Sequence, residues 1–298
     1  MIAIDLGSNT IRFVEFDGCE WGRSFEKIVR TAEGLNESGL IGENAQRRIV
    51  EAIAEARERL EWENRSIVAY TTAAMRRARN ASDVLARIER ESGLRFEIID
   101  PMREASLTLL AVQYRLKKLG IGTEAFVLAD IGGGSTELIR VEGGKSNALS
   151  IEKGIVTLSE SVRRAAELGE KIAEFAACVR NAFPDPSGML VLTAGTPTTI
   201  AAYVNGMDYE TYDPARINGY VLSLRECYRA YDELLAMDED RRTRYVGVGR
   251  ENLIIAGILM VTALYEALGH EEAIVVDDGL REGIALDYFN RKSDTSAL

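Results

Sequence analysis

The chain has 298 residues, of which 46% are hydrophobic and 28% are charged, the balance of a folded globular protein. Its formal net charge of −11 excludes a general binder of DNA or of other polyanions. The length is too great for one α/β core of ordinary size and is sufficient for two.

The first part of the chain is predicted to form one α/β unit that begins with a β-hairpin. After the hairpin, Glu20–Val29 is predicted to form a further strand region, and Gly42–Glu61 has the apolar periodicity of a helix. The other predicted elements are a strand at Ser66–Thr72, a helix at Ala81–Ser92 ending at Gly93, a strand at Phe96–Ile99 and a helix at Arg103–Leu119 ending at Gly120.

A second unit opens at Phe126, again with a hairpin. Its other predicted elements are helices around Thr157–Leu168 and Glu170–Ala182, a buried strand Met189–Thr193 leading into Gly195–Thr199, helices at about Leu224–Met237 and Glu251–Leu268, a strand Ala273–Val276 and a helix Leu280–Phe289. We predict two domains, residues 1–120 and 121–298, and leave open whether the last helix, about 280–298, packs back onto the first. Because no linker rich in Pro, Gly or Ser separates them, we expect a shared interface with the active-site cleft between the two hairpin tips.

Composition also constrains the compartment and the metal chemistry. Met1–Leu6 is apolar with no basic region before it, so we expect no signal peptide and a cytoplasmic protein. Leu253–Tyr265 is the longest apolar run and is too short to span a bilayer, so we predict a buried helix and no membrane partner. The single histidine, His270, excludes a His-rich metal centre, and the three cysteines form no CxxC motif.

The two hairpins are related by an internal repeat, Ala3–Gly18 and Leu128–Gly143. Aligned without gaps, the copies match at four positions: Asp5 with Asp130, Gly7 with Gly132, Thr10 with Ser135, and Gly18 with Gly143. Each copy is an apolar strand, an Asp, a tight turn of small residues and a second alternating strand. A duplicated polar tip favours function over an ordinary glycine-rich turn.

Such a tip suits a phosphate group. Glycines let the backbone approach an anion and direct several N–H groups at it, Ser and Thr hydroxyls add donors, and the Asp before the turn can hold a divalent cation. The second tip lacks the GK[ST] ending of a P-loop, and Gly247–Asn252 lacks the last glycine of a dinucleotide-binding fingerprint. The sequence therefore predicts a phosphate site of neither type.

Further motifs extend over nearly the whole chain. They are Ile4–Thr10 (IDLGSNT), Thr72–Arg76 (TAAMR), Glu104-Ala105, Asp130–Glu137 (DIGGGSTE), Ala194–Thr196 (AGT) and Asp278–Gly283 (DGLREG). With these motifs the chain resembles the exopolyphosphatase / guanosine pentaphosphate phosphohydrolase (Ppx/GppA) family. That family belongs to the superfamily of acetate and sugar kinases, heat-shock chaperone ATPases and actin. The resemblance implies an α/β protein of two similar ribonuclease H-like (actin-like ATPase) domains, with mixed sheets flanked by helices. Longer members carry an HD-type domain, and we expect the short, two-domain form here.

The resemblance also implies the catalytic residue. Glu104 matches the family's catalytic Glu, which would act as general base on the attacking water. On sequence alone Glu104 is a first-turn Glu favoured by the helix dipole. Ile99–Arg103 departs from the Ser-Gly that usually precedes this Glu, and we expect the neighbouring Arg103 to lower the pKa of Glu104.

The remaining site residues follow from the same matches. Asp130 and Glu137, with Asp5 as a further contributor, would hold Mg²⁺ (or Mn²⁺) directly or through water. The residues expected to bind phosphate are Ser8, Asn9, Thr10, Arg76, Gly132, Gly133, Gly134, Ser135, Thr136, Gly195 and Thr196. The cluster Arg76–Arg79 is equally consistent with solvated surface.

The implied activity is release of terminal orthophosphate from polyphosphate, or of the γ-phosphate from guanosine pentaphosphate. Two alternatives stay open, an ATP-dependent small-molecule kinase or actin-like ATPase, and a polyphosphate or alarmone sensor without turnover. The sequence does not choose between the two substrates and leaves a homodimer open.

Overall fold

The computed structural model describes residues 1–161, 165–183 and 188–295. The chain divides into two compact units, Met1–Ala111 with the segment from Gly279 onward, and Val112–Asp278. The boundary between Ala111 and Val112 therefore lies inside a long helix, Pro101–Lys118, whereas the sequence predicted it at residue 120. The last helix groups with the first unit.

The first unit is built on a mixed sheet. Its strands are β1 (Ile2–Leu6), β2 (Thr10–Phe16), β3 (Trp21–Ile28), β4 (Ile67–Thr71) and β5 (Glu97–Ile98). They lie in the order β3-β2-β1-β4-β5, with β1 antiparallel to β2 and parallel to β4. All five residues of β1 are buried, as expected for a central strand covered on both faces.

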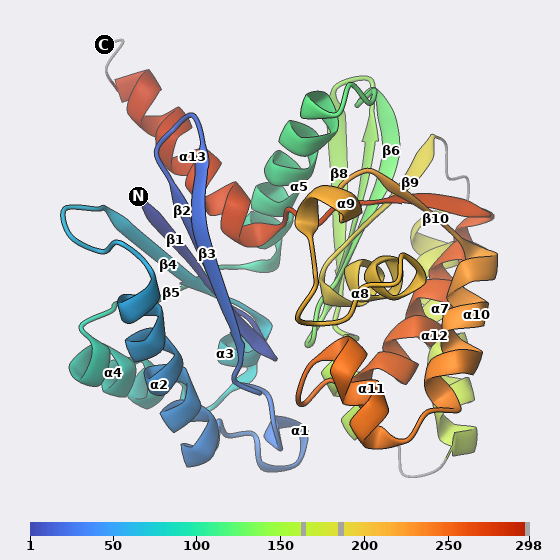
Figure 1. Cartoon of the computed structure of the whole chain (residues 1–298), viewed down its shortest axis with the longest axis horizontal. Helices are drawn as coiled ribbons and strands as arrows, with labels where there is room; N and C mark the ends of the chain where they lie inside the picture. Colours follow the sequence, from blue (N-terminus) through green and yellow to red (C-terminus); the bar gives the residue numbers. More distant parts are fainter. Residues whose placement is uncertain (162–164, 184–187, 296–298) are drawn as a thin grey trace. The chain divides into compact units, whose positions relative to one another are not determined.

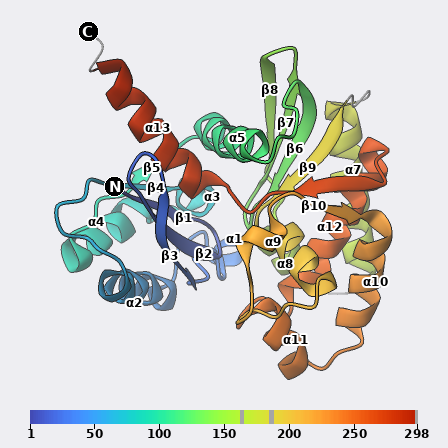
Figure 2. The same ribbon diagram turned by 45° about the horizontal axis from the view of Figure 1, so that its top comes forward.

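Helices cover both faces of this sheet. They are α1 (Leu35–Ser38), α2 (Glu43–Arg59), α3 (Ala73–Arg77), α4 (Ala81–Ser92), α5 (Pro101–Lys118), which runs on into the second unit, and α13 (Leu280–Thr295). Figures 1 and 2 show α2 and α4 on one face of the sheet and α13 on the other. Helix α13 packs on β1 and β2, where the Phe289 ring contacts the Phe16 ring edge-on, with 5.4 Å between the ring centroids.

The second unit repeats this plan. Its strands are β6 (Ala125–Ile131), β7 (Thr136–Glu142), β8 (Lys145–Ile151), β9 (Met189–Thr193), β10 (Tyr220–Ser223) and β11 (Glu272–Val275). Their order is β10-β11-β9-β6-β7-β8, so β6, β7, β8 and β9 are arranged as β1, β2, β3 and β4 are in the first sheet. The prediction of two similar ribonuclease H-like domains with mixed sheets flanked by helices is confirmed. A cleft between the hairpin tips stays a prediction.

The helices of the second unit enclose its core. They are α6 (Ile155–Glu160), α7 (Ala165–Ala182), α8 (Gly195–Val204), α9 (Pro214–Ile217), α10 (Leu224–Leu235), α11 (Glu239–Val246) and α12 (Leu253–Leu268). The apolar run is the buried helix that the sequence predicted, with Ile258, Val261 and Tyr265 inaccessible to solvent. In the described part of the chain, no helix is long and apolar enough to cross a membrane.

The predicted and the observed elements differ at several places. The helix predicted at 157–168 is two helices, α6 and α7, and residues 162–164 between them lie outside the described residues. Strand β8 and helix α8 were not predicted. Strand β8 has a polar, exposed sequence without the apolar residues typical of strands, and helix α8 begins with Gly-Thr-Pro, which has poor helix propensity.

Candidate active site

The two repeated hairpin turns close in the same way. The Gly7 N–H donates to the Thr10 carbonyl at 3.0 Å, and the Gly132 N–H donates to the Ser135 carbonyl at 3.0 Å. The positions paired by the ungapped alignment are therefore equivalent in the backbone as well as in residue type.

The carbonyls of each turn are held by the segment that follows the third strand. The Ala32 N–H donates to the Ser8 carbonyl at 2.8 Å, and the Val156 N–H donates to the Gly133 carbonyl at 2.8 Å. At Gly154 a Cβ would lie 2.5 Å from the Gly133 carbonyl carbon, so the approach requires glycine there. Both turns are thus held in place by hydrogen bonds to their backbone carbonyl groups.

The amide side of the turns is the side that can meet an anion. Within the described residues, the backbone N–H groups of Ser8, Asn9, Gly133 and Gly134 donate to no protein acceptor. Successive N–H groups in a tight turn form a concave anion site. The predicted phosphate ligands of the two turns therefore have donors to offer.

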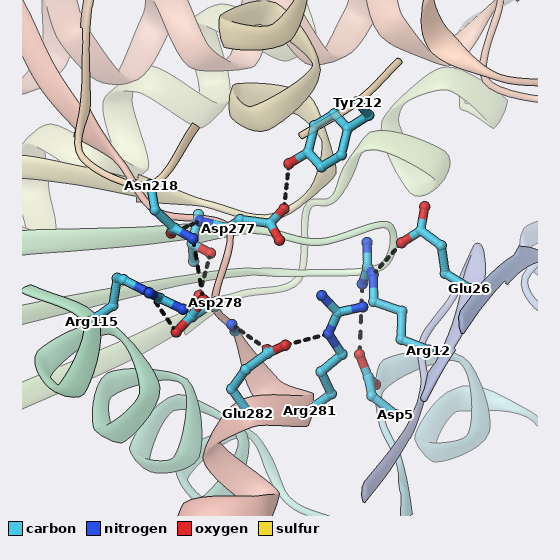
Figure 3. Close-up of polar contacts among 12 residues, drawn as sticks. Asp5, Arg12, Glu26, Arg115, Tyr212, Asn218, Asp277, Asp278, Arg281 and Glu282 are labelled. Carbon is cyan, nitrogen blue, oxygen red and sulfur yellow. Dashed lines mark hydrogen bonds and ion pairs between the residues drawn. The ribbon is translucent and has the colours of Figure 1, made fainter. Parts of the chain in front are cut away.

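The aspartate of the first hairpin faces an arginine. Asp5 on β1 lies opposite Arg12 on β2, and Arg12 lies opposite Glu26 on β3. The Arg12 guanidinium is 3.6 Å from the Asp5 carboxylate and 3.3 Å from that of Glu26 (Figure 3). In this row across the sheet, the Arg12 guanidinium therefore places a positive charge between two carboxylates.

The aspartate of the second hairpin faces a second acid. Asp130 on β6 lies opposite Glu137 on β7, and Glu137 lies opposite Ser150 on β8. The Ser150 hydroxyl donates to the Glu137 Oε1 at 2.7 Å, and Glu137 is 1% exposed. Two adjacent carboxylates are a donor set of hard oxygens that fits Mg²⁺, which completes its shell with water and substrate oxygens. No cluster of three or more His, Cys, Asp or Glu suited to a metal occurs among the described residues.

Glu104, the predicted general base, is paired with Arg76. Glu104 lies in the first turn of α5 and is 9% exposed, and Arg76 lies near the end of α3. The Arg76 Nη1 donates to the Glu104 Oε2 at 2.8 Å and to the Ile99 carbonyl at 2.8 Å. Two of the predicted site residues are thereby brought together within the first unit.

The side chain of Arg103 contacts a different helix. Its guanidinium pairs with Asp287 of α13, and its backbone N–H donates to the Asp100 side chain at 2.9 Å at the start of α5. The partners of Arg103 therefore lie elsewhere, and the guanidinium that hydrogen-bonds to Glu104 comes from α3. The expected effect of Arg103 on the pKa of Glu104 stays a prediction.

The other arginines of that cluster hold a loop. Arg77 donates to Asn36, and the Arg79 Nη2 donates to the Ser38 carbonyl at 2.7 Å. The Arg79 N–H donates to the Gly39 carbonyl at 3.0 Å. These contacts fix the segment around α1, and Arg77 and Arg79 are both exposed, as the surface interpretation of the cluster expects.

Gly195 and Thr196 lie at the start of α8, which follows β9. Ala194 between strand and helix has φ 78° and ψ 177°, a conformation that costs an L-residue free energy and persists only where the surrounding structure holds it. Thr196 is 5% exposed, and at Gly257 of α12 a Cβ would lie 2.6 Å from the Thr196 Oγ1. The helix start is thus held against α12, and the first N–H groups of α8 have no acceptor within the helix itself.

One polar cluster of the second unit was not predicted from the sequence (Figure 3). Arg115 of α5 donates to both oxygens of Asp278, at 2.9 and 3.0 Å, and Asp278 is 4% exposed. The Thr193 hydroxyl, just before Ala194, donates to the Asp278 carbonyl at 3.0 Å. Asp278 opens the DGLREG motif, which was the one available signal, but its partner is 163 residues away in sequence.

Two mixed sheets of the same plan, each with a hairpin turn that has available amide donors, define a protein of the ribonuclease H-like class. The chain belongs to the Ppx/GppA phosphatase family, whose model matches residues 24–292.

Individual relatives support the assignment along the whole chain. Exopolyphosphatase 1 of Mycobacterium leprae is 28% identical over 317 residues, covering 99% of this chain and 91% of the relative. The crystal structure of the Aquifex aeolicus Ppx/GppA family member superposes with a TM-score of 0.76 at 28% identity, covering 98% and 97% of the two chains. The guanosine-5'-triphosphate,3'-diphosphate pyrophosphatase of Vibrio cholerae O395 is 26% identical over 295 residues, covering 96% of this chain but 58% of the relative.

Proposed function

We propose that this protein is a phosphoanhydride hydrolase that releases terminal orthophosphate from polyphosphate, or the γ-phosphate from guanosine pentaphosphate. The observation that carries the proposal is that, in the second unit, a tight turn with available backbone N–H donors lies beside two carboxylates, Asp130 and Glu137, on facing strand positions. Membership of the family and the names of the relatives support the two substrates.

Glu104 is the proposed general base. A carboxylate held in place by Arg76 at 2.8 Å can orient a water molecule and accept its proton as the water oxygen bonds to phosphorus. The bridging P–O bond of the anhydride breaks, and orthophosphate leaves with the shortened chain or nucleotide on the other side.

The charge on the phosphoryl oxygens is met by backbone and hydroxyl donors. The N–H groups at Ser8, Asn9, Gly133 and Gly134, with the hydroxyls of Thr10, Ser135 and Thr136, are the proposed phosphate ligands, and Gly195 and Thr196 extend them at the start of α8. Arg76, whose guanidinium donates to Glu104, is a further proposed phosphate ligand.

Asp130 and Glu137 are the proposed ligands of Mg²⁺ (or Mn²⁺). Such an ion, when bound, neutralises charge on the phosphates. Arg12 already supplies a positive charge to Asp5, so Asp5 is the weakest of the three predicted metal ligands.

The change Glu104→Gln tests the general base. The amide keeps the shape of the carboxylate but cannot accept a proton, so we expect kcat to fall by about 10²–10⁴-fold with substrate binding retained. The measurement is phosphate release together with equilibrium binding of polyphosphate. Glu97→Gln, at an exposed position on β5, is the matched control and should leave kcat unchanged. Wild-type turnover in Glu104→Gln would remove Glu104 from this role.

A substrate panel tests the function itself. Phosphate release with Mg²⁺ from polyphosphates of several lengths, guanosine pentaphosphate and ATP separates the candidate activities. Release from either of the first two supports the hydrolase and identifies its substrate. Release from ATP alone, coupled to phosphorylation of a small molecule, would replace the hydrolase with a kinase, and tight binding without release would replace it with a sensor.

A further inference from the structure

Each unit has a row of three side chains that runs across its first three strands, and the two rows occupy equivalent positions. In the first unit the row is Asp5, Arg12 and Glu26, and strand register places them side by side. Its charges alternate, and Arg12 lies within 3.6 Å of the one acid and 3.3 Å of the other. The guanidinium is thus a built-in cation between two carboxylates.

The equivalent row of the second unit has different charges. It is Asp130, Glu137 and Ser150, again adjacent by strand register. Glu137 replaces the arginine, which places two acids directly opposite each other, an arrangement that like charges disfavour. Ser150 replaces the outer acid of the first row. With serine there, the second row has no third negative charge, and the Ser150 hydroxyl donates a hydrogen bond to the Glu137 Oε1 at 2.7 Å.

This contact restrains a carboxylate that has little access to water. Glu137 is 1% exposed, and a hydrogen bond to one of its oxygens limits rotation of the carboxylate plane. Groups that orient a ligand in this way raise the affinity of metal sites, and their loss typically weakens binding by about 10- to 100-fold. A hydroxyl suits the position because it donates to the carboxylate without adding charge.

We propose that Ser150 is a positioning residue of the divalent-cation site, and that the cation takes in the second row the place that the Arg12 guanidinium takes in the first. The inference rests on the proposed function, because Asp130 and Glu137 are its proposed metal ligands. Ser150 itself touches neither metal nor substrate in this assignment. It acts through Glu137.

Mn²⁺ binding, followed by electron paramagnetic resonance of the free ion, tests the proposal without substrate. In Ser150→Ala we expect the Mn²⁺ dissociation constant to rise about 10-fold. In Ser150→Thr, which keeps the hydroxyl, it should stay within about twofold of wild type. The matched control is Ser146→Ala, because Ser146 lies on the same face of β8 four residues away and is exposed. It should bind Mn²⁺ as the wild type does.

A second readout separates this role from a merely structural one. The concentration of Mg²⁺ that gives half-maximal phosphate release should rise in Ser150→Ala, while kcat at saturating Mg²⁺ stays near the wild-type value. Unchanged Mn²⁺ affinity in Ser150→Ala, or equal losses in Ser150→Ala and Ser150→Thr, would overturn the role of Ser150 and leave the hydrolase intact. A wild type that releases phosphate from no substrate in the panel would instead overturn the proposed function.

Discussion

Glu15 is a buried carboxylate near the end of β2, outside the candidate site. It is 3% exposed, and its oxygens accept from the backbone N–H groups of Glu61 at 2.6 Å and Arg23 at 3.3 Å. Burial alone would raise the pKa of Glu15, but these two N–H groups, with the Arg23 and Arg65 guanidinium groups, outweigh it and hold the pKa below its usual value. The ionised carboxylate therefore ties β2 to the segment around Glu61.

The sign of this shift gives a pH-dependent prediction. Because the folded-state pKa is lowered, the contribution of Glu15 is fully present above the unfolded-state pKa and is lost as the pH falls through the folded-state value. We expect Glu15→Gln to lower the free energy of unfolding by about 2 kcal/mol at neutral pH. The difference from wild type should shrink in acid. Urea unfolding across the pH range measures it, and a pH-independent difference would contradict the assignment.

Among the helices, α13 and α5 approach each other at Gly283. A Cβ at this position would lie 2.0 Å from the Leu107 carbonyl oxygen of α5, which is backbone and cannot turn aside. The second glycine of the DGLREG motif is thereby explained by helix packing.

The change Gly283→Ala should therefore separate the two helices. We expect a loss of about 2–3 kcal/mol in the free energy of unfolding, the usual cost of overpacking. The matched control is Gly169→Ala in α7, where an added Cβ meets nothing within 4 Å and better helix propensity should stabilise by up to about 1 kcal/mol. Denaturant midpoints of both variants measure this, and equal effects of the two would refute the packing explanation.

The elements themselves were predictable to different degrees. The two hairpins could be predicted from the alternation of apolar and polar residues and from the matched Asp and Gly positions. In the structure the two hairpins are alike even in the hydrogen bond that closes each turn. Strand β8 was missed because an edge strand needs no apolar face, and α8 because burial and the strained Ala194 set its start despite poor propensity.

The candidate site shows the same limit. Residues on one motif, such as Asp130 and Glu137, could be named together from the sequence. The Arg76–Glu104 and Arg115–Asp278 pairs join positions 28 and 163 residues apart, and no local pattern predicts such contacts. Register across strands placed Ser150 beside Glu137, and register is a property of the folded sheet.

At the scale of the whole molecule, the two units differ in how they use the chain. The second is one continuous stretch, Val112–Asp278, whereas the first combines the beginning of the chain with α13. Its sheet depends on that helix, because Phe16 of β2 is 2% exposed and packs against Phe289.

We therefore expect Phe289→Ala to loosen the first unit alone. Loss of the ring should cost about 2 kcal/mol and speed amide hydrogen exchange in β1 and β2, while β6 and β7 keep their wild-type protection. Tyr245→Ala is the reciprocal control, because its ring meets Tyr203 edge-on at 5.1 Å inside the second unit. Faster exchange in both sheets from either change would show that the units do not unfold independently.

The place of α13 in the chain also affects how the protein emerges from the ribosome. Strands β1 and β2 are made before the second unit, but the helix that covers them is made after it. At about 5–20 residues per second the β1–β2 face waits on the order of ten seconds or more for its cover. The first unit is therefore completed only after the second unit has been made. Its apolar face around Phe16 is the surface that a holding chaperone would meet during synthesis.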